Sequence, residues 1–450
     1  MFRCLPPPMC LLLFTATFAV TACADQPNIV FILSDDQGYA DVGFMGATEI
    51  RTPHLDQLAS RGTILESFYV QPVCSPTRAS LMTGRYVSRT GVYHVVRPNA
   101  RWGLPLAERT LADAVRAAGY QTAICGKWHL GEFQPDYRPT QRGFDLQYGH
   151  WFGALDYFTH RRDGQLDWHR NDQPCADQGY STHLIAAEAC RIIREKRKDQ
   201  PLFLYVPFNA VHAPHQVPAR YTQPFTNLSG VRRTYAGMVA AMDEAVGQIV
   251  TALDDKGLSD NTLIIFSSDN GGPAPGRVTS NGPLRAGKGT IYEGGIRVCA
   301  FASWPGHIPS SQRNAEPMHI VDWYPTLVKL AGGSLQQQLP LDGRDIWPVL
   351  TQGAKSPHEA LFLPGMAPHQ AAIRKGDWKL LMKAGLPGGE QPDSSPSGGA
   401  VELYNLATDI GETKNVADEH PAVAGELEAL LSDWLKSAVA HGDPKLQPAG

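Results

Sequence analysis

The chain has 450 residues, of which 43% are hydrophobic, so it can bury the core of one large domain and a smaller one. Lysine and arginine total 40, aspartate and glutamate total 44, and the formal net charge is −4 at pH 7. This balance excludes the strong basic field of a nucleic-acid-binding domain, and we expect no nucleic-acid partner. The basic run at residues 191–198 is interpreted as the solvated end of a helix.

The N-terminus predicts an export signal. Residues 9–24 carry no charge and follow Arg3. This stretch is too short for a membrane span but fits the apolar region of a signal peptide, with small residues at 22–24 before the expected cleavage. The sequence before Cys23 also loosely resembles a lipoprotein box, so lipidation of Cys23 is the less favoured alternative. We expect residues 1–24 to be removed, leaving an exported protein, periplasmic or secreted, without a stable membrane span.

Cysteine usage excludes a disulfide-stapled scaffold. Cleavage before residue 25 leaves Cys74, Cys125, Cys175, Cys190 and Cys299. Five is an odd number, so at least one thiol is unpaired or used chemically. A disulfide between Cys175 and Cys190 stays open, because the sequence does not give the separation of their Cα atoms.

Short apolar, β-branched runs alternate with helical patterns along most of the chain. The runs predict buried strands at residues 28–33, 122–125, 202–206 and 262–266. The helical patterns begin at Pro53 and stop before Gly62, and recur at residues 111–118 and 235–254. This alternation predicts an α/β fold with a mostly parallel sheet covered by helices on both faces.

The pattern changes after about residue 355. Residues 371–382 and 401–406 predict antiparallel strands, and residues 421–438 predict an amphipathic helix. Between the strands, residues 385–400 are rich in Gly, Pro and Ser and predict a mobile loop. We therefore expect a catalytic α/β domain over residues 25–355 and a small C-terminal α+β subdomain over residues 356–450.

Polar side chains of a particular kind follow each predicted strand. They are Asp35 and Asp36 after the first, Lys127 and His129 after the second, His212 after the third, and Asp269 and Asn270 after the fourth. Ligands of open α/β sheets bind outside the carboxyl ends of the strands. A single aspartate there is usually a cap or turn residue, but four coincident cases favour one shared crevice.

The candidate ligands are oxygen atoms. The carboxylates of Asp35, Asp36 and Asp269 and the amide of Asn270 suit a hard cation, Ca²⁺ or Mg²⁺, better than Zn²⁺. Three converging carboxylates would repel one another without a cation. Cationic or hydrogen-bond-donating side chains near the same crevice predict a binding site for an anionic group, and they are Arg78, Lys127, His129, His212 and Lys288.

Cys74 lies in the pattern Cys-x-Pro-x-Arg, which ends at Arg78 and is followed by Ala-Ser and "LMTGRY". Taken alone, Cys74 is an ordinary buried cysteine. The motif resembles the signature of the type I sulfatases, and the similarity extends over nearly the whole chain. Further segments that carry it are residues 34–46, 52–62, 126–131, 267–272, 283–298 and 402–415. Residues 216–221 and 235–247 resemble the arylsulfatase B branch, the N-acetylgalactosamine-4-sulfatases.

The resemblance implies an alkaline-phosphatase-like fold and a modified catalytic residue. A formylglycine-generating enzyme would oxidise Cys74 to 3-oxoalanine (formylglycine), whose hydrated aldehyde attacks the sulfur of a sulfate ester. One Ca²⁺ would be held by residue 74 together with Asp35, Asp36, Asp269 and Asn270. The implied catalytic residues are Arg78, which orients the diol; His129, the base for sulfate elimination; and Lys127, His212 and Lys288, which bind sulfate oxygens. His212 or Lys288 would protonate the leaving alcohol.

The expected function is hydrolysis of a sulfated sugar, with a 4-sulfated galactosamine unit of a glycosaminoglycan as the first candidate. A formylglycine-dependent phosphonate or phosphodiester hydrolase is one alternative. A non-catalytic sulfated-glycan-binding protein is another, although such a protein has no need of Cys-x-Pro-x-Arg. The candidates for the pocket rim, which packing would explain equally well, are His150, Trp151, Asp156, Tyr157 and His160.

Overall fold

The computed structural model describes residues 1–2, 26–382 and 401–442. The predicted signal peptide, apart from its first two residues, and the predicted loop at 385–400 lie outside the described residues, as does Cys23. All five cysteines of the described part are free thiols, so the disulfide between Cys175 and Cys190 is not formed.

The centre of the fold is a ten-stranded sheet with the order β13-β2-β12-β11-β1-β10-β4-β5-β8-β9. Its core consists of parallel strands that contain the four predicted ones: β11 (Thr262–Ser268), β1 (Asn28–Ser34), β10 (Leu202–Pro207) and β4 (Gln121–Lys127), followed by β5 (Leu146–His150). In register, Ile29 of β1 lies between Phe203 of β10 and Leu263 of β11. These strands read as continuous apolar runs because both faces of the sheet are buried.

Shorter strands extend the sheet at both edges. On one side are β12 (Ala300–Ser303), antiparallel to β11, then β2 (Thr63–Leu65) and β13 (Gln312–Asn314). On the other side are β8 (His169–Arg170) and β9 (Gln173–Pro174). Two small sheets lie apart, formed by β3 (Phe68–Tyr69) with β14 (Met318–His319) and by β6 (Arg161–Arg162) with β7 (Gln165–Leu166).

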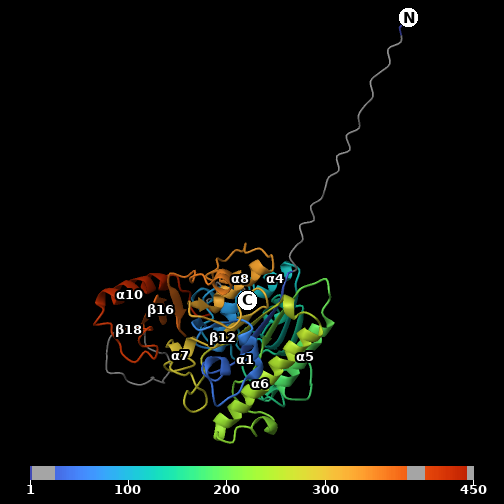
Figure 1. The fold of residues 1–450 in the computed structure, drawn as a ribbon, viewed down its shortest axis with the longest axis horizontal. Helices are drawn as coiled ribbons and strands as arrows, with labels where there is room; N and C mark the ends of the chain where they lie inside the picture. Colours follow the sequence, from blue (N-terminus) through green and yellow to red (C-terminus); the bar gives the residue numbers. More distant parts are fainter. Residues whose placement is uncertain (3–25, 383–400, 443–450) are drawn as a thin grey trace.

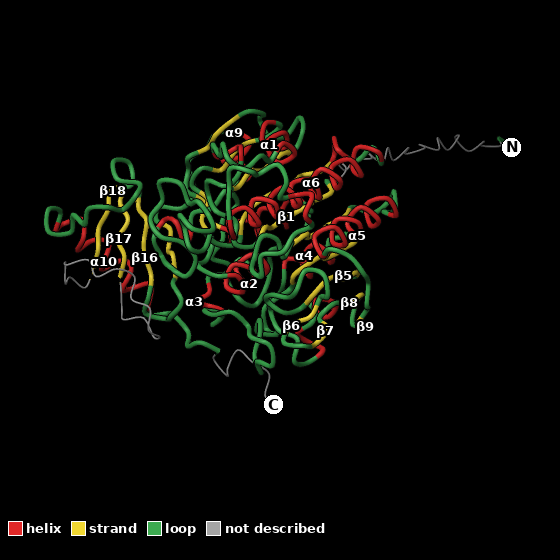
Figure 2. The backbone as a smooth tube through the Cα atoms, turned by 90° about the horizontal axis from the view of Figure 1, so that it is seen from below, coloured by secondary structure: helices red, strands yellow, loops and turns green. Residues whose placement is uncertain are grey.

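Helices cover both faces of the large sheet, which confirms the predicted fold class (Figures 1 and 2). One face packs against α1 (Pro53–Ser60), α5 (Ser181–Glu195) and α6 (Gly230–Asp255). The other packs against α2 (Cys74–Thr83), α4 (Leu111–Ala117) and α8 (Trp323–Leu330). Short α-helices elsewhere in the described domain are α3 (Val87–Thr90), α7 (Glu293–Ile296) and α9 (Trp347–Gln352).

Helix α6 is long and apolar enough to cross a membrane by length and composition. Its apolar residues are instead part of the protein core, because Tyr235, Met238, Val246 and Ile249 are fully buried in the layer that covers the sheet. The helix is therefore a core helix of a folded domain.

The C-terminal region forms the predicted antiparallel sheet and helix (Figure 1, left side). Its strands pair in chain order and are β15 (Leu361–Pro364), β16 (Ala371–Lys375), β17 (Trp378–Met382) and β18 (Val401–Asn405). Helix α10 (Pro421–Leu435) packs on this sheet through Leu427 and Leu431 and ends three residues before the predicted limit of 438. The other face of the sheet packs against Tyr69 and Tyr292 of the preceding region.

Candidate active site

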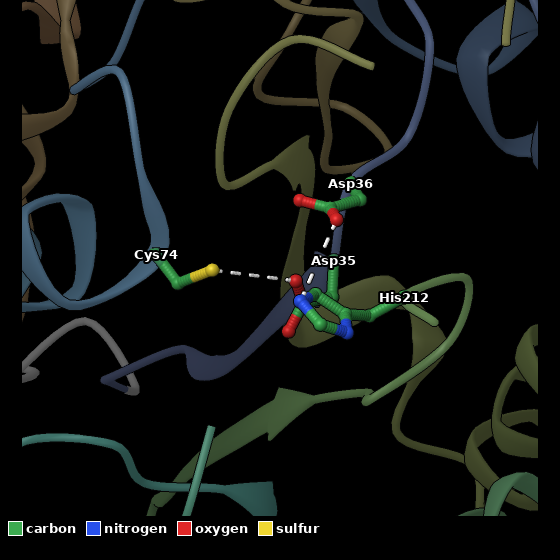
Figure 3. A group of neighbouring side chains, drawn as sticks. All are labelled: Asp35, Asp36, Cys74 and His212. Carbon is green, nitrogen blue, oxygen red and sulfur yellow. Dashed lines mark hydrogen bonds and ion pairs between the residues drawn. The ribbon is translucent and has the colours of Figure 1, made fainter. Parts of the chain in front are cut away.

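Side chains from separate elements meet beyond the carboxyl ends of the central strands. Asp35 and Asp36 follow β1, Cys74 begins α2, and His212 lies in the loop after β10. Their potential metal-ligating atoms lie within 4.8 Å of one another (Figure 3). Parallel strands bring their carboxyl ends to the same edge of a sheet, so residues far apart in the sequence come together here.

Cys74 is buried, with 1% of its surface exposed. Its Sγ atom lies 3.6 Å from Oδ1 of Asp35 and 3.4 Å from Nζ of Lys288. Burial and the charge of Asp35 raise the pKa of the Cys74 thiol to about 12. An unmodified Cys74 is therefore a neutral thiol near pH 7 and a poor nucleophile.

The spacing of the Cys-x-Pro-x-Arg motif has a direct structural reason. Residues four apart on a helix share one face, so Arg78 points to the same crevice as Cys74 at the start of α2. The buried guanidinium of Arg78 donates to Asp35 Oδ2 at 3.1 Å, to Asp269 Oδ2 at 2.9 Å and to the carbonyl oxygen of Lys127 at 3.0 Å. One side chain thereby ties together the ends of β1, β4 and β11.

Asp36 adopts a left-handed backbone conformation, with φ at 63°, and its carboxylate faces three partners. Asn270 Nδ2 donates to Asp36 Oδ1 at 2.7 Å, Lys288 Nζ lies 2.6 Å from the same oxygen, and His212 Nε2 lies 3.6 Å from Oδ2. Burial alone would raise the pKa of Asp36, but the charges of Lys288 and His212 outweigh it and lower that pKa. Asp36 is therefore a carboxylate over the whole physiological range.

Asp269 and Asn270 both contact Asp36, one of the four residues of the potential metal-ligating group. The backbone N–H of Asp36 donates to Asp269 Oδ1 at 3.1 Å. Burial and the charge of Asp35 raise the pKa of Asp269 to about 6. Oδ1 of Asn270 is buried and has no hydrogen-bond partner in the described part of the chain. A buried oxygen without a donor is the kind of atom that a cation can satisfy.

Lys127 Nζ contacts Asp35 Oδ2, and both side chains are fully buried. The crevice thus sets three carboxylates, Asp35, Asp36 and Asp269, against three basic side chains, which are Arg78, Lys127 and Lys288. Burying such charges is costly unless they are paired, and here they are paired with one another. A bound divalent cation would give the site an excess of positive charge.

His129 is held as a neutral imidazole with a defined tautomer. Its Nε2 lies 2.9 Å from the carbonyl oxygen of Val96, which can only accept, so Nε2 carries the proton. Nδ1 is buried and has no hydrogen-bond partner among the described residues. Burial, together with the charges of Lys127 and Arg78, lowers the pKa of His129 well below its usual value. This arrangement presents an unprotonated Nδ1 that can accept a proton.

His212 is fixed by its own loop. Its Nδ1 lies 2.5 Å from the carbonyl oxygen of Ala213, so Nδ1 carries the proton, and Nε2 points toward Asp36. The hydroxyl of Tyr157 donates a hydrogen bond to the His212 carbonyl oxygen at 2.8 Å and so anchors the loop. Burial lowers the pKa of His212 to about 4.

Four of the five predicted rim residues form internal packing, as the packing alternative expected. Four of them are at most 7% exposed, namely His150, Trp151, Tyr157 and His160. Trp151 stacks on His169 with ring centroids 3.6 Å apart, and His160 stacks on Trp168 at 4.5 Å. Asp156 is less buried, and its carboxylate accepts hydrogen bonds from Gln216 and Thr159.

Two features of the site escaped the sequence analysis. The Val96 carbonyl that orients His129 is a main-chain group, and no side-chain pattern announces it. Gly153 lies against the His129 ring, where a Cβ atom would come within 2.4 Å of Cε1 and Nε2. The glycine in "WFGALDY" was the available signal for this close approach.

Comparison with known proteins identifies the family of the chain. The family described as Sulfatase matches residues 27–334. Arylsulfatase J of Mus musculus is 37% identical over 96% of this chain and 79% of its own length. N-acetylgalactosamine-6-sulfatase of Sus scrofa is 34% identical over 79% of this chain and 72% of its own length. The crystal structure of Ps i-CgsB in complex with k-i-k-neocarrahexaose is 33% identical, covers 92% of this chain and 94% of its own, and has a TM-score of 0.83.

The chain belongs to the sulfatase family and is a sulfuric ester hydrolase with the family's alkaline-phosphatase-like fold. The relatives bear several different sulfatase names, so these matches leave the arylsulfatase B branch as a proposal.

Proposed function

We propose that this enzyme removes sulfate from a sulfated saccharide, using Cys74 as formylglycine and one Ca²⁺. The observation that carries the proposal is the position of Cys74. Its Sγ lies 3.6 Å from Asp35 Oδ1 and 3.4 Å from Lys288 Nζ, and these two residues are ion-paired with Arg78 and Asp36 respectively.

The residues present fit a calcium ion. The proposed ligands are the oxygens of Asp35, Asp36, Asp269 and Asn270, together with residue 74, and the unpartnered Oδ1 of Asn270 is one of them. Such hard oxygen ligands favour Ca²⁺ over Zn²⁺. Calcium bound there would supply positive charge that attracts and polarises a sulfate group.

The basic side chains then bind the sulfate oxygens. Lys127 and Lys288 are the proposed ammonium donors, and Arg78 orients residue 74 through its fixed fork of N–H groups. These donors are positioned before the substrate arrives, because each is already held by buried carboxylates. Preorganised donors of this kind stabilise charge that develops on oxygen in the transition state.

As formylglycine, residue 74 would supply a hydrated aldehyde, of which one hydroxyl attacks sulfur and the second permits release of sulfate. The raised pKa of the Cys74 thiol supports the need for this modification. The proposed base is His129, whose free Nδ1 takes the proton from the second hydroxyl.

We propose Lys288 as the acid that protonates the leaving alcohol. Burial would lower the pKa of Lys288, but Asp36 outweighs it and raises that pKa well above its usual value, so the ammonium is protonated near pH 7. His212 is mostly neutral there with its proton on Nδ1, so it is proposed to bind a sulfate oxygen through Nε2 only in its protonated form. The sequence did not decide whether His212 or Lys288 protonates the leaving alcohol.

The proposed substrate class is a sulfated saccharide, because a solved structure 33% identical to this chain holds k-i-k-neocarrahexaose. A 4-sulfated galactosamine unit of chondroitin or dermatan sulfate is the first candidate, on the resemblance of residues 216–221 and 235–247 to the arylsulfatase B branch. We further propose export, with maturation by a formylglycine-generating enzyme.

The mass of the Cys74 peptide, taken from protein purified from its native host, tests the proposal. We expect the mass of the aldehyde or its hydrate, and hydrolysis of an aryl sulfate that Cys74→Ala abolishes. An alkylatable thiol at position 74 of the native protein would refute the formylglycine mechanism. Parallel assays on sulfate and phosphate esters with the same leaving group would reveal a phosphodiesterase instead.

A further inference from the structure

The segment that orients His129 continues into an exposed basic stretch. The backbone N–H of Val96 donates to Ser75 Oγ at 3.0 Å, and the Val96 carbonyl accepts from His129 Nε2 at 2.9 Å. Val96 therefore touches both the residue after Cys74 and the proposed base. Arg97 is the next residue in the chain, and its side chain is exposed.

The side chains that follow are cationic or aromatic. Arg97 and Arg101 are exposed, and neither makes an ion pair with any described residue. His94 and Trp102 are half-buried, and both pack edge-on against His441, with ring centroids 5.2 Å and 4.7 Å away. We call His94, Arg97, Arg101 and Trp102 the basic rim.

The C-terminal end of the described chain holds this segment in place. The Tyr93 hydroxyl donates to the Val439 carbonyl at 3.0 Å, and the Val439 N–H donates to the Ser88 carbonyl at 2.8 Å. The Gly442 N–H donates to the Gly91 carbonyl at 3.1 Å. A segment anchored in this way loses little conformational freedom when it binds a ligand.

Little negative charge opposes the two arginines. The carboxyl of Glu132 accepts a hydrogen bond from the backbone of Asn99, in the middle of the segment. Burial and the charge of Asp167 raise the pKa of Glu132 to about 8, so it is mostly neutral near pH 7. The two arginines of the basic rim therefore keep a net positive charge, in the segment that follows Val96.

We propose that the basic rim is a subsite for the neighbouring unit of an anionic polysaccharide. Arg97 and Arg101 bind sulfate or carboxylate groups of that unit, for which the guanidinium fork is suited. Trp102 offers an aromatic surface to the sugar ring. The inference rests on the proposed function and extends it: the enzyme prefers chains over single sulfated sugars.

The test measures how chain length affects affinity. Chondroitin sulfate oligosaccharides of two, four and six sugars compete with para-nitrophenyl sulfate for the matured enzyme, and the inhibition constant is determined for each. Direct binding of the hexasaccharide to the Cys74→Ala variant is measured by calorimetry at two salt concentrations. This second measurement does not depend on turnover, so it separates failure of the rim from failure of the catalytic proposal.

We expect the hexasaccharide to bind more tightly than the disaccharide. The double variant Arg97→Gln, Arg101→Gln should weaken hexasaccharide binding about tenfold more than it weakens the aryl sulfate, and it should reduce the salt dependence. The matched control is Arg61→Gln, an exposed arginine beside Asp260 at the opposite edge of the sheet, which should leave both values unchanged. Equal affinity for all chain lengths, or an unaltered hexasaccharide affinity in the double variant, would overturn the proposal.

Discussion

A fully buried charge network joins the C-terminal sheet to the rest of the protein, and its central residue is Lys379. Lys379 on β17 has no exposed surface, and its Nζ lies 2.8 Å from Glu293 Oε1 and 2.8 Å from Glu412 Oε1. Glu412 also accepts from the N–H of Glu293 at the start of α7, at 2.7 Å. Glu293 keeps two further partners, Arg297 at 3.2 Å and the Tyr69 hydroxyl at 2.8 Å.

We expect Lys379→Met to lower the free energy of unfolding by about 3 to 5 kcal/mol at pH 8, since removing one partner leaves a buried charge uncompensated. Glu293 retains its ion pair with Arg297, so Glu412 is the buried carboxylate that loses its cationic partner in the variant. Burial and nearby Glu293 already raise the pKa of Glu412 to about 7, despite the opposing charge of Lys379. Without Lys379 this pKa would rise further.

The sign of the pH dependence follows from that shift. A carboxyl whose folded-state pKa exceeds the ordinary 4.5 binds more protons in the folded than in the unfolded state between the two values, so stability falls as pH rises through this window. In the variant, the higher folded-state pKa of Glu412 extends this pH range upward. The loss caused by Lys379→Met should therefore be larger at pH 8 than at pH 5.5, where Glu412 is protonated.

Guanidinium-chloride unfolding followed by tryptophan fluorescence at both pH values measures this. The matched control is Lys375→Met in the same sheet, whose exposed ion pair with Glu426 should contribute at most about 0.5 kcal/mol. A loss below about 1 kcal/mol for Lys379→Met at pH 8, or an equal loss at pH 5.5, would refute the reasoning.

Three further predictions concern the active site. Arg78→Lys should lower kcat/KM for an aryl sulfate about 100-fold. The reason is that an ammonium group cannot reproduce the contacts of the guanidinium with two carboxylates and the Lys127 carbonyl. A loss under fivefold (about 1 kcal/mol) would contradict this prediction. Gly153→Ala should reduce activity, because the added Cβ would displace the His129 ring. The control Gly425→Ala, on an open face of α10, should keep full activity and slightly raise the unfolding temperature. Equal activity in both variants would contradict the predicted clash between residue 153 and His129. Chelation by EGTA should abolish activity and lower the unfolding temperature, with recovery on adding Ca²⁺, and an unchanged melting curve would argue against a bound cation.

The central strands of the fold could be predicted from the sequence. Parallel strands buried on both faces are continuous apolar runs, so residues 28–33 and 262–266 were recognisable as the strands that became β1 and β11. The edge strands were not recognisable. β2 and β13 have three residues each, and their pairing, such as Ile64 with Phe301 and Arg313, depends on residues more than 200 positions away.

The grouping of the site residues followed from the sequence, because they stand directly after strands or in one helical motif. Asp35, Asp269 and Arg78 were predicted to meet, and they do so within hydrogen-bond distance. Their individual roles remain proposals. The sequence left the His150 to His160 region undecided, because aromatic residues and histidines after a strand suit a sugar-binding surface and a packed interior equally well.

Tertiary structure alone decided the protonation and support of these residues. The tautomer of His129 depends on a carbonyl oxygen 33 positions earlier in the chain, and the pairing of Lys379 with Glu293 joins residues 86 positions apart. Composition and local periodicity report which side chains are available and which strand or helix they lie on. Burial, orientation and the charge of each neighbour are set by contacts between distant segments, and those contacts exist only once the chain has folded.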